Sequence, residues 1–219
     1  MLVEGRLPPF LVRSYGRIAY VLSGISLLQI ALRFRVLRKS PGLIEAWAFG
    51  HLLLSAAALW LSTTHPQSGW TPAALLYGVV RVVQLVAYQS TVVFFDGFRT
   101  PRSTPEYAVT GYRRLILLTL HNYLEIAFWF AAIYSHYSSF FRDETHALSS
   151  FTGALYYSAV TMTTVGYGDV VPICRLSRIT VTLQLLVGAF LTLIILARFI
   201  AFLPKPRTLD SEERSEPLA

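Results

Sequence analysis

Residues 161–169 read Thr-Met-Thr-Thr-Val-Gly-Tyr-Gly-Asp, and long apolar segments lie on both sides of them. Gly166 and Gly168 are separated by one residue, and glycine adopts left-handed backbone angles without a steric penalty. When alternate residues take such angles, consecutive carbonyl oxygens turn toward a single axis. Neutral carbonyl dipoles can replace the water shell of a cation there, and they bind it weakly enough at successive sites for rapid transit. The stretch therefore predicts a ladder of cation sites built from the backbone of Thr164–Gly168.

The side chains of this ladder have different predicted roles. Thr164 adds a hydroxyl oxygen at the inner end, whereas Val165 and Tyr167 point away from the axis and pack against neighbouring helices. One chain supplies only one wall of such a site, and the sequence holds one ladder. Because an ion ringed by oxygens at every level needs several copies around an axis, a cyclic homo-oligomer is implied.

A short apolar stretch, Ala147–Thr163, runs into the ladder. It is shorter than the roughly 20 residues that cross a bilayer as a helix. We expect a half-helix that dips into the membrane and returns, and the partial negative charge at its C-terminus would favour a cation. Asp169 lies just beyond the ladder, where its carboxylate can attract cations and accept a hydrogen bond from the half-helix. Tyr157 is the candidate donor of that hydrogen bond.

The composition is that of a membrane protein. The 219 residues are 54% hydrophobic and 14% charged, with a mean hydropathy of +0.50, whereas soluble domains carry about 25% charged residues. The net charge of +7 comes mostly from arginines at the ends of apolar runs, a pattern that orients membrane helices and does not indicate a nucleic-acid partner. Cys174 is the single cysteine, and no metal-ligand spacing or nucleophile–base set predicts a cofactor or an enzyme.

Five apolar stretches have about the length that crosses a bilayer, and in lipid such a segment must be helical to satisfy its own backbone. They are Tyr15–Leu32, Leu43–Leu61, Ala73–Phe95, Leu115–Tyr134 and Ile179–Leu203. The first has only 15 uncharged residues between Arg17 and Arg33. It either crosses the membrane, with its flanking arginines snorkelling, or lies at the interface. We therefore predict an all-α integral membrane protein with four or five transmembrane helices plus the re-entrant half-helix.

The charges of the loops predict the orientation in the cell membrane. The loops after the first and third stretches are rich in arginine, whereas residues 62–69 between the second and third carry no arginine or lysine. Arginine-rich loops stay in the cytoplasm. The ladder then opens to the outside and the C-terminus is cytoplasmic. Five spans would place the N-terminus outside, although Arg6, Arg13 and Arg17 favour the inside.

Residues 154–169, Ala-Leu-Tyr-Tyr-Ser-Ala-Val-Thr-Met-Thr-Thr-Val-Gly-Tyr-Gly-Asp, closely resemble the pore helix and selectivity filter of the potassium channel family. Pro172 follows where many members have it, and Gly188 matches the family's hinge glycine in the inner helix. The resemblance covers roughly residues 113–203. It implies a homotetramer in the lipid bilayer that passively conducts K⁺ in preference to Na⁺, with no cofactor besides the permeant ion.

The resemblance also assigns roles to individual residues of the filter, Thr164–Gly168. K⁺ is expected at carbonyl oxygens from Thr164, Val165, Gly166 and Tyr167, and the residues that support the filter are Tyr157, Thr163 and Asp169. The chain departs from the family in two ways. Tyr156 and Tyr157 replace a pair of tryptophans found in many members, and Val160 replaces a glutamate that some members bury to hold the aspartate after the filter.

The chain is expected to divide into three parts. Residues 1–104 form membrane helices of unassigned role, residues 105–203 form the pore module, and residues 204–219 form a short cytoplasmic tail. The pore module begins with a short interfacial helix at residues 105–110. A voltage sensor is not predicted, because it needs a helix with a basic residue at every third position and the third apolar stretch has only Arg81 in its interior.

Two charges are predicted at mid-membrane depth, and such charges usually pair. Arg81 lies about nine residues into the third stretch and Glu125 about eleven into the fourth, which places both near the bilayer centre at about 1.5 Å per residue. We predict an ion pair between them; the alternatives are that Glu125 bonds His121 or Asn122, or is protonated. For Gly188, a hinge competes with a role in close helix packing.

Two other functions are compatible with such a sequence. A K⁺ transporter of related build would carry four degenerate filters in one long chain, whereas this chain has one intact filter. A non-conducting accessory protein would not need to keep suitable chemistry at every filter position, as this chain does. A passive K⁺ channel is therefore the favoured interpretation.

Overall fold

The computed structural model describes residues 41–94 and 112–203. Four helices within these residues are long and apolar enough to cross a membrane. They are α3 (Pro41–Thr64), α4 (Thr71–Phe94), α5 (Tyr112–His136) and α7 (Arg175–Phe202). The prediction of an all-α membrane protein is confirmed. The first apolar stretch, the interfacial helix at residues 105–110 and the tail lie outside the described residues, so a fifth span remains a prediction.

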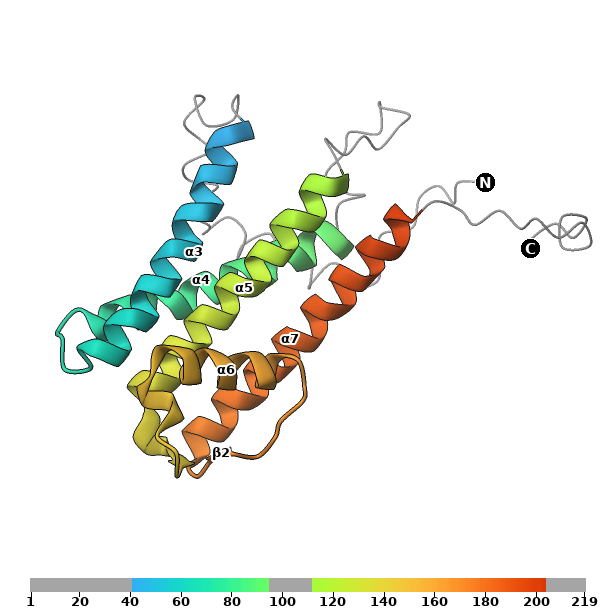
Figure 1. Ribbon diagram of the computed structural model, residues 1–219. Helices are drawn as coiled ribbons and strands as arrows, with labels where there is room; N and C mark the ends of the chain where they lie inside the picture. Colours follow the sequence, from blue (N-terminus) through green and yellow to red (C-terminus); the bar gives the residue numbers. More distant parts are fainter. Residues whose placement is uncertain (1–40, 95–111, 204–219) are drawn as a thin grey trace, which may run out of the picture.

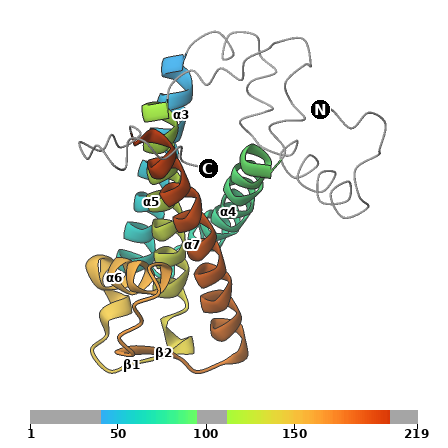
Figure 2. The same ribbon diagram turned by 90° about the vertical axis from the view of Figure 1, so that its right-hand side faces the viewer.

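Helix α5 is the centre of the bundle (Figure 1). It packs along α3 on one side and against α6 and α7 on the other, while α4 leans away from α5 and α7 toward its C-terminal end (Figure 2). The core is built largely from α5, whose Ile126, Trp129 and Tyr134 are fully buried. Gly78 of α4 lies so close to Trp129 that an added Cβ would be 2.8 Å from the ring atom Cδ2.

The connection from α5 to α7 contains the half-helix α6 (Phe151–Met162). Before α6 come η3 (Ser138–Phe140), β1 (Phe141–Asp143) and η4 (Ala147–Ser149), and after it comes β2 (Val170–Pro172). The predicted helical stretch began at Ala147, but the turn η4 occupies its first residues. Ser150 then caps α6 by accepting a hydrogen bond from the Gly153 amide at 3.1 Å.

Helix α6 does not cross the membrane. Its 12 residues extend about 18 Å at 1.5 Å per residue, well short of the roughly 30 Å hydrocarbon core. The chain then returns to the same end of the bundle, where β2 pairs antiparallel with β1 in the register Arg142↔Val171 (Figure 2). The segment is therefore re-entrant, as expected, and the returning loop is held by a two-stranded sheet.

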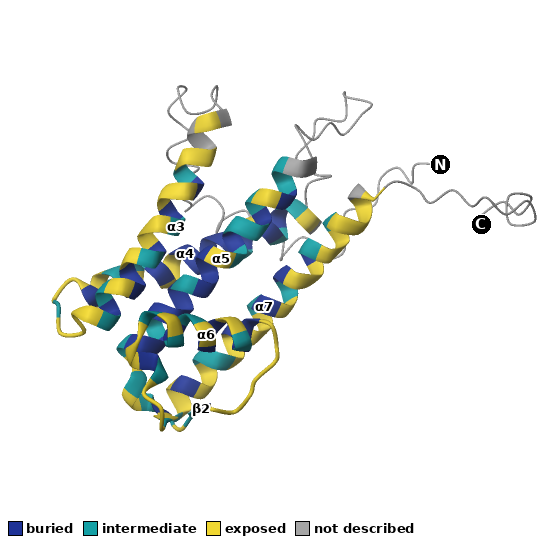
Figure 3. Ribbon diagram, in the orientation of Figure 1, coloured by how far each residue is buried: buried dark blue, intermediate teal, exposed yellow. Residues whose placement is uncertain are grey.

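Much of α7 and the loop that follows α6 are exposed, as are parts of α3 and the loop after it (Figure 3). Only 22% of the apolar window of α7 is buried, compared with 56% for α5. The exposed side chains of α7 include Leu183, Leu186, Leu193 and Leu196. Within one chain, α7 and the loop thus present a large surface to lipid or to other protein.

Candidate functional site

The loop after α6 begins with backbone hydrogen bonds to the last turn of the helix. The amide of Thr164 donates to the carbonyl of Thr161 at 3.1 Å, and the amide of Val165 donates to the carbonyl of Val160 at 2.9 Å. The hydroxyl of Thr163 bonds the Ala159 carbonyl at 2.8 Å. The start of the filter is therefore fixed to the C-terminal end of the half-helix.

Left-handed backbone angles alternate along the filter. The φ angles are +63° at Thr164, +56° at Gly166 and +80° at Gly168. An added Cβ at either glycine would meet nothing within 4 Å in the single chain, so glycine is needed for its backbone angles and not for space. The sequence indicated the two glycines. It did not indicate Thr164, because a left-handed residue with a side chain costs about 1–2 kcal/mol.

The side chains of Val165 and Tyr167 are exposed in the single chain, by 52% and 71%. The ring of Tyr167 lies parallel to that of Tyr156 on α6, with an interplanar angle of 5° and centroids 6.3 Å apart. This contact agrees with the expectation that Tyr167 packs against the half-helix. The remaining exposed area of both side chains is available to another chain.

Asp169 lies near two tyrosines of α6, of which sequence reasoning named only Tyr157. We expected Tyr157 to be the donor, and the structure places Asp169 near both tyrosines, with the Tyr156 hydroxyl in position to donate to its carboxylate. Neighbouring residues in a helix differ by about 100° in direction. Tyr157 therefore faces the core, where it is buried and packs edge-on against Tyr134 with centroids 5.0 Å apart.

The inner helix α7 is a continuous helix through Gly188. An added Cβ at Gly188 would overlap the carbonyl oxygen of Met162 and lie 2.8 Å from its Cγ. Met162 is the last residue of α6 and is fully buried. The geometry thus gives Gly188 a direct role in close packing beneath the filter, while the hinge stays a prediction.

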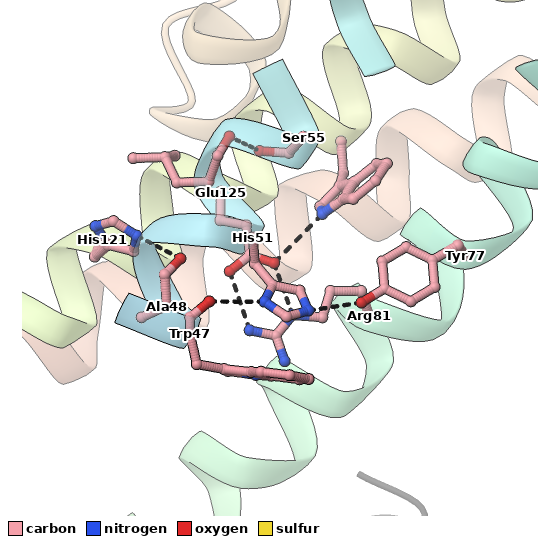
Figure 4. A network of polar contacts seen from close by, with 10 residues as sticks. Trp47, Ala48, His51, Ser55, Tyr77, Arg81, His121 and Glu125 are labelled. Atoms are coloured by element: carbon pink, nitrogen blue, oxygen red, sulfur yellow. Dashed lines mark hydrogen bonds and ion pairs between the residues drawn. The ribbon is translucent and has the colours of Figure 1, made fainter. Parts of the chain in front are cut away.

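The charges predicted at mid-membrane depth meet in the structure (Figure 4). Arg81 donates from Nε to Oε1 of Glu125 at 2.7 Å and from a terminal nitrogen to Oε2 at 3.2 Å. The side chain of Glu125 is 0% exposed and that of Arg81 is 6% exposed. The alternative partner His121 instead bonds the carbonyl of Ala48 at 2.9 Å.

Other polar side chains of the first two described helices also link helices. His51 of α3 lies between the carbonyl of Trp47 at 2.8 Å and the hydroxyl of Tyr77 on α4 at 2.6 Å (Figure 4). Near the end of α7, Arg198 bonds Thr119 of α5 and Gln89 of α4. The His51 contact thus links α4 to α3, and the Arg198 contacts link α7 to α4 and α5, all through part-buried polar groups.

Cys174 caps α7 at the filter end of the bundle. Its sulfur accepts a hydrogen bond from the Ser177 amide at 3.4 Å, and the Ser177 hydroxyl accepts one from the Cys174 amide at 3.2 Å. The hydrogen bonds from Ser177 lower the pKa of the Cys174 thiol below its usual value. The thiol is half-buried, which makes it a useful chemical probe of this end of the molecule.

Comparison with known proteins identifies part of the chain. Residues 122–205 match the family model described as ion channel, whereas no curated protein and no solved structure matches the chain. The matched segment begins within α5 and includes α6, the filter and α7. The match is to a family of ion channels and not of enzymes, in agreement with the sequence. Residues 122–205 are therefore similar to an ion-channel domain, and the described part of the chain carries four helices long and apolar enough to cross a membrane.

Proposed function

We propose that the chain is one subunit of a K⁺-selective channel in which four copies surround a common axis. The observation that carries the proposal is the left-handed φ angle at Thr164, Gly166 and Gly168. This alternation lets consecutive carbonyl oxygens face one direction, so that carbonyls from Thr164 to Tyr167 bind successive dehydrated K⁺ ions.

The half-helix supports cation binding at the inner end of the filter. Its C-terminus carries the partial negative charge of the helix dipole, and the filter starts two residues after Met162. At the other end, the carboxylate of Asp169 draws cations toward the outer mouth. The helix dipole and the Asp169 carboxylate therefore both attract a cation, although neither is one of its proposed carbonyl ligands.

The exposed surfaces of the pore module support assembly. Val165, Tyr167 and the leucines on one side of α7 are exposed in the single chain, and a closed ring around an axis buries such surfaces on every copy. The arginine-rich loops support a cytoplasmic position for the C-terminal end of α7. The filter mouth then opens outside the cell membrane.

Ion flux from liposomes that contain the purified protein tests this proposal. We expect K⁺ flux that Na⁺ does not match and that Ba²⁺ blocks. Gly166→Ala should abolish it, because Ala disfavours the φ angle of +56°. Gly50→Ala is the matched control, since an added Cβ on this α3 glycine meets nothing within 4 Å. Equal flux of Na⁺ and K⁺, or full flux through Gly166→Ala, would contradict the proposal.

A further inference from the structure

A fully buried amide joins the three helices of the pore module. Gln184 lies in the apolar middle of α7, and its side chain is 0% exposed. Its Nε2 donates to the Ser158 hydroxyl at 2.7 Å and to the Ser158 carbonyl at 3.0 Å on α6. Its Oε1 accepts a hydrogen bond from the hydroxyl of Tyr134 on α5 at 2.6 Å. One side chain thus bonds both helices that flank it.

Ser158 completes this set of contacts, which we call the Gln184 network. Its hydroxyl donates to the carbonyl of Ala127 on α5 at 2.7 Å, and Ser158 and Tyr134 are fully buried. Both N–H groups of the amide and both hydroxyl hydrogens therefore have acceptors. A satisfied polar network in a low-dielectric core fixes relative positions, because any shift leaves a buried group unpaired.

The Gln184 network is connected to the filter through the last turn of α6. Val160 follows Ser158 by two residues on α6, and its carbonyl accepts the amide of the filter residue Val165 at 2.9 Å. Met162, the last residue of α6, packs against Gly188 of α7. A tilt or rotation of α6 around Ser158 would therefore displace Val165 directly, with no flexible segment between them.

The apolar side chain of Val160 makes the hydrogen bonds of the Gln184 network more important for holding α6. Val160 has no polar group that could bond Asp169 from behind the filter. Among the described residues, the half-helix is instead held by buried hydrogen bonds at Ser158, to Gln184 of α7 and to Ala127 of α5.

We propose that Gln184 is a positioning residue of the filter, which sets the orientation of α6 through Ser158 and thereby the alignment of the carbonyl ligands. This inference rests on the proposed K⁺-channel function. Gln184 does not touch the ion. Its effect on selectivity passes through the Val160–Val165 hydrogen bond.

The test compares Gln184→Met with Gln89→Met in full-length protein reconstituted in liposomes. Met keeps the length of the side chain and removes its hydrogen bonds in both variants. Gln89 is also buried, at 2% exposure, but it bonds Arg198 and not α6. We expect Gln184→Met to lower the K⁺/Na⁺ permeability ratio about tenfold, the equivalent of one net hydrogen bond. Gln89→Met should retain the wild-type ratio.

Ser158→Ala keeps the inference testable if Gln184→Met does not fold. It removes one hydroxyl and should also lower the permeability ratio. A wild-type ratio in folded Gln184→Met or Ser158→Ala overturns the inference, as does an equal loss in Gln89→Met. If the wild-type protein itself passes Na⁺ and K⁺ equally, the proposed function fails first and the inference fails with it. A selective wild type beside an unchanged Gln184→Met overturns the inference alone.

Discussion

Replacing Glu125 by Gln removes one charge from the buried pair with Arg81 while nearly preserving the size of the side chain. The guanidinium cannot lose its own charge, and the site is almost fully closed to solvent. The carboxylate also lies 3.4 Å from the indole nitrogen of Trp129. Removing one partner of a buried ion pair costs about 3–5 kcal/mol. We expect Glu125→Gln to lower the free energy of unfolding by about that amount.

The assay is reversible unfolding in mixed micelles with increasing denaturing detergent, followed by circular dichroism. Glu45→Gln is the matched control, because Glu45 forms a similar 2.9 Å pair with Arg114 but its side chain is 55% exposed. Such surface pairs contribute about 0–1 kcal/mol. The reasoning is refuted if the two variants agree within about 0.5 kcal/mol. Exchanging the residues, as Arg81→Glu with Glu125→Arg, should restore much of the lost stability.

Three further predictions concern the filter and its surroundings. Gly188→Ala should lower the free energy of unfolding by about 1–3 kcal/mol through overpacking against Met162; unchanged stability with altered channel opening would instead favour a hinge. Tyr156→Phe keeps the ring but removes the hydrogen bond to Asp169, so currents should decay faster at low external K⁺; an unchanged decay rate would contradict a supporting role for this bond. The lowered pKa of the Cys174 thiol should make it react with an impermeant maleimide added outside, and faster than a free cysteine at neutral pH; labelling only from the inside would reverse the proposed orientation.

Much of the filter could be predicted because its chemistry depends on local sequence. Two glycines at alternate positions permit left-handed angles without a steric penalty, and both have such angles. The length of the apolar stretch before them was enough to exclude a full span. The ion pair between Arg81 and Glu125 could also be predicted, since the rise of a helix places both at the same depth and charges within a membrane usually pair.

Contacts that depend on the direction of a side chain were harder to predict from the sequence. Tyr156 and Tyr157 are adjacent and chemically identical, and only the rotation of α6 decides which one faces Asp169. The Gln184 network joins residues 26 and 50 positions apart in the sequence, and no periodic pattern connects them. The sequence shows only that each of these polar residues lies in an apolar helix. That pattern does not predict which residues bond one another. The strands β1 and β2 have three residues each, too few for any pattern.

The most direct measurement of K⁺ selectivity is the reversal potential of the purified protein in a planar bilayer, with KCl on one side and NaCl on the other. A filter of aligned carbonyls from Thr164 to Tyr167 predicts a reversal potential displaced strongly toward the K⁺ equilibrium potential. A reversal potential near zero would mean that Na⁺ and K⁺ pass equally, and it would contradict K⁺ selectivity whatever current the protein carries.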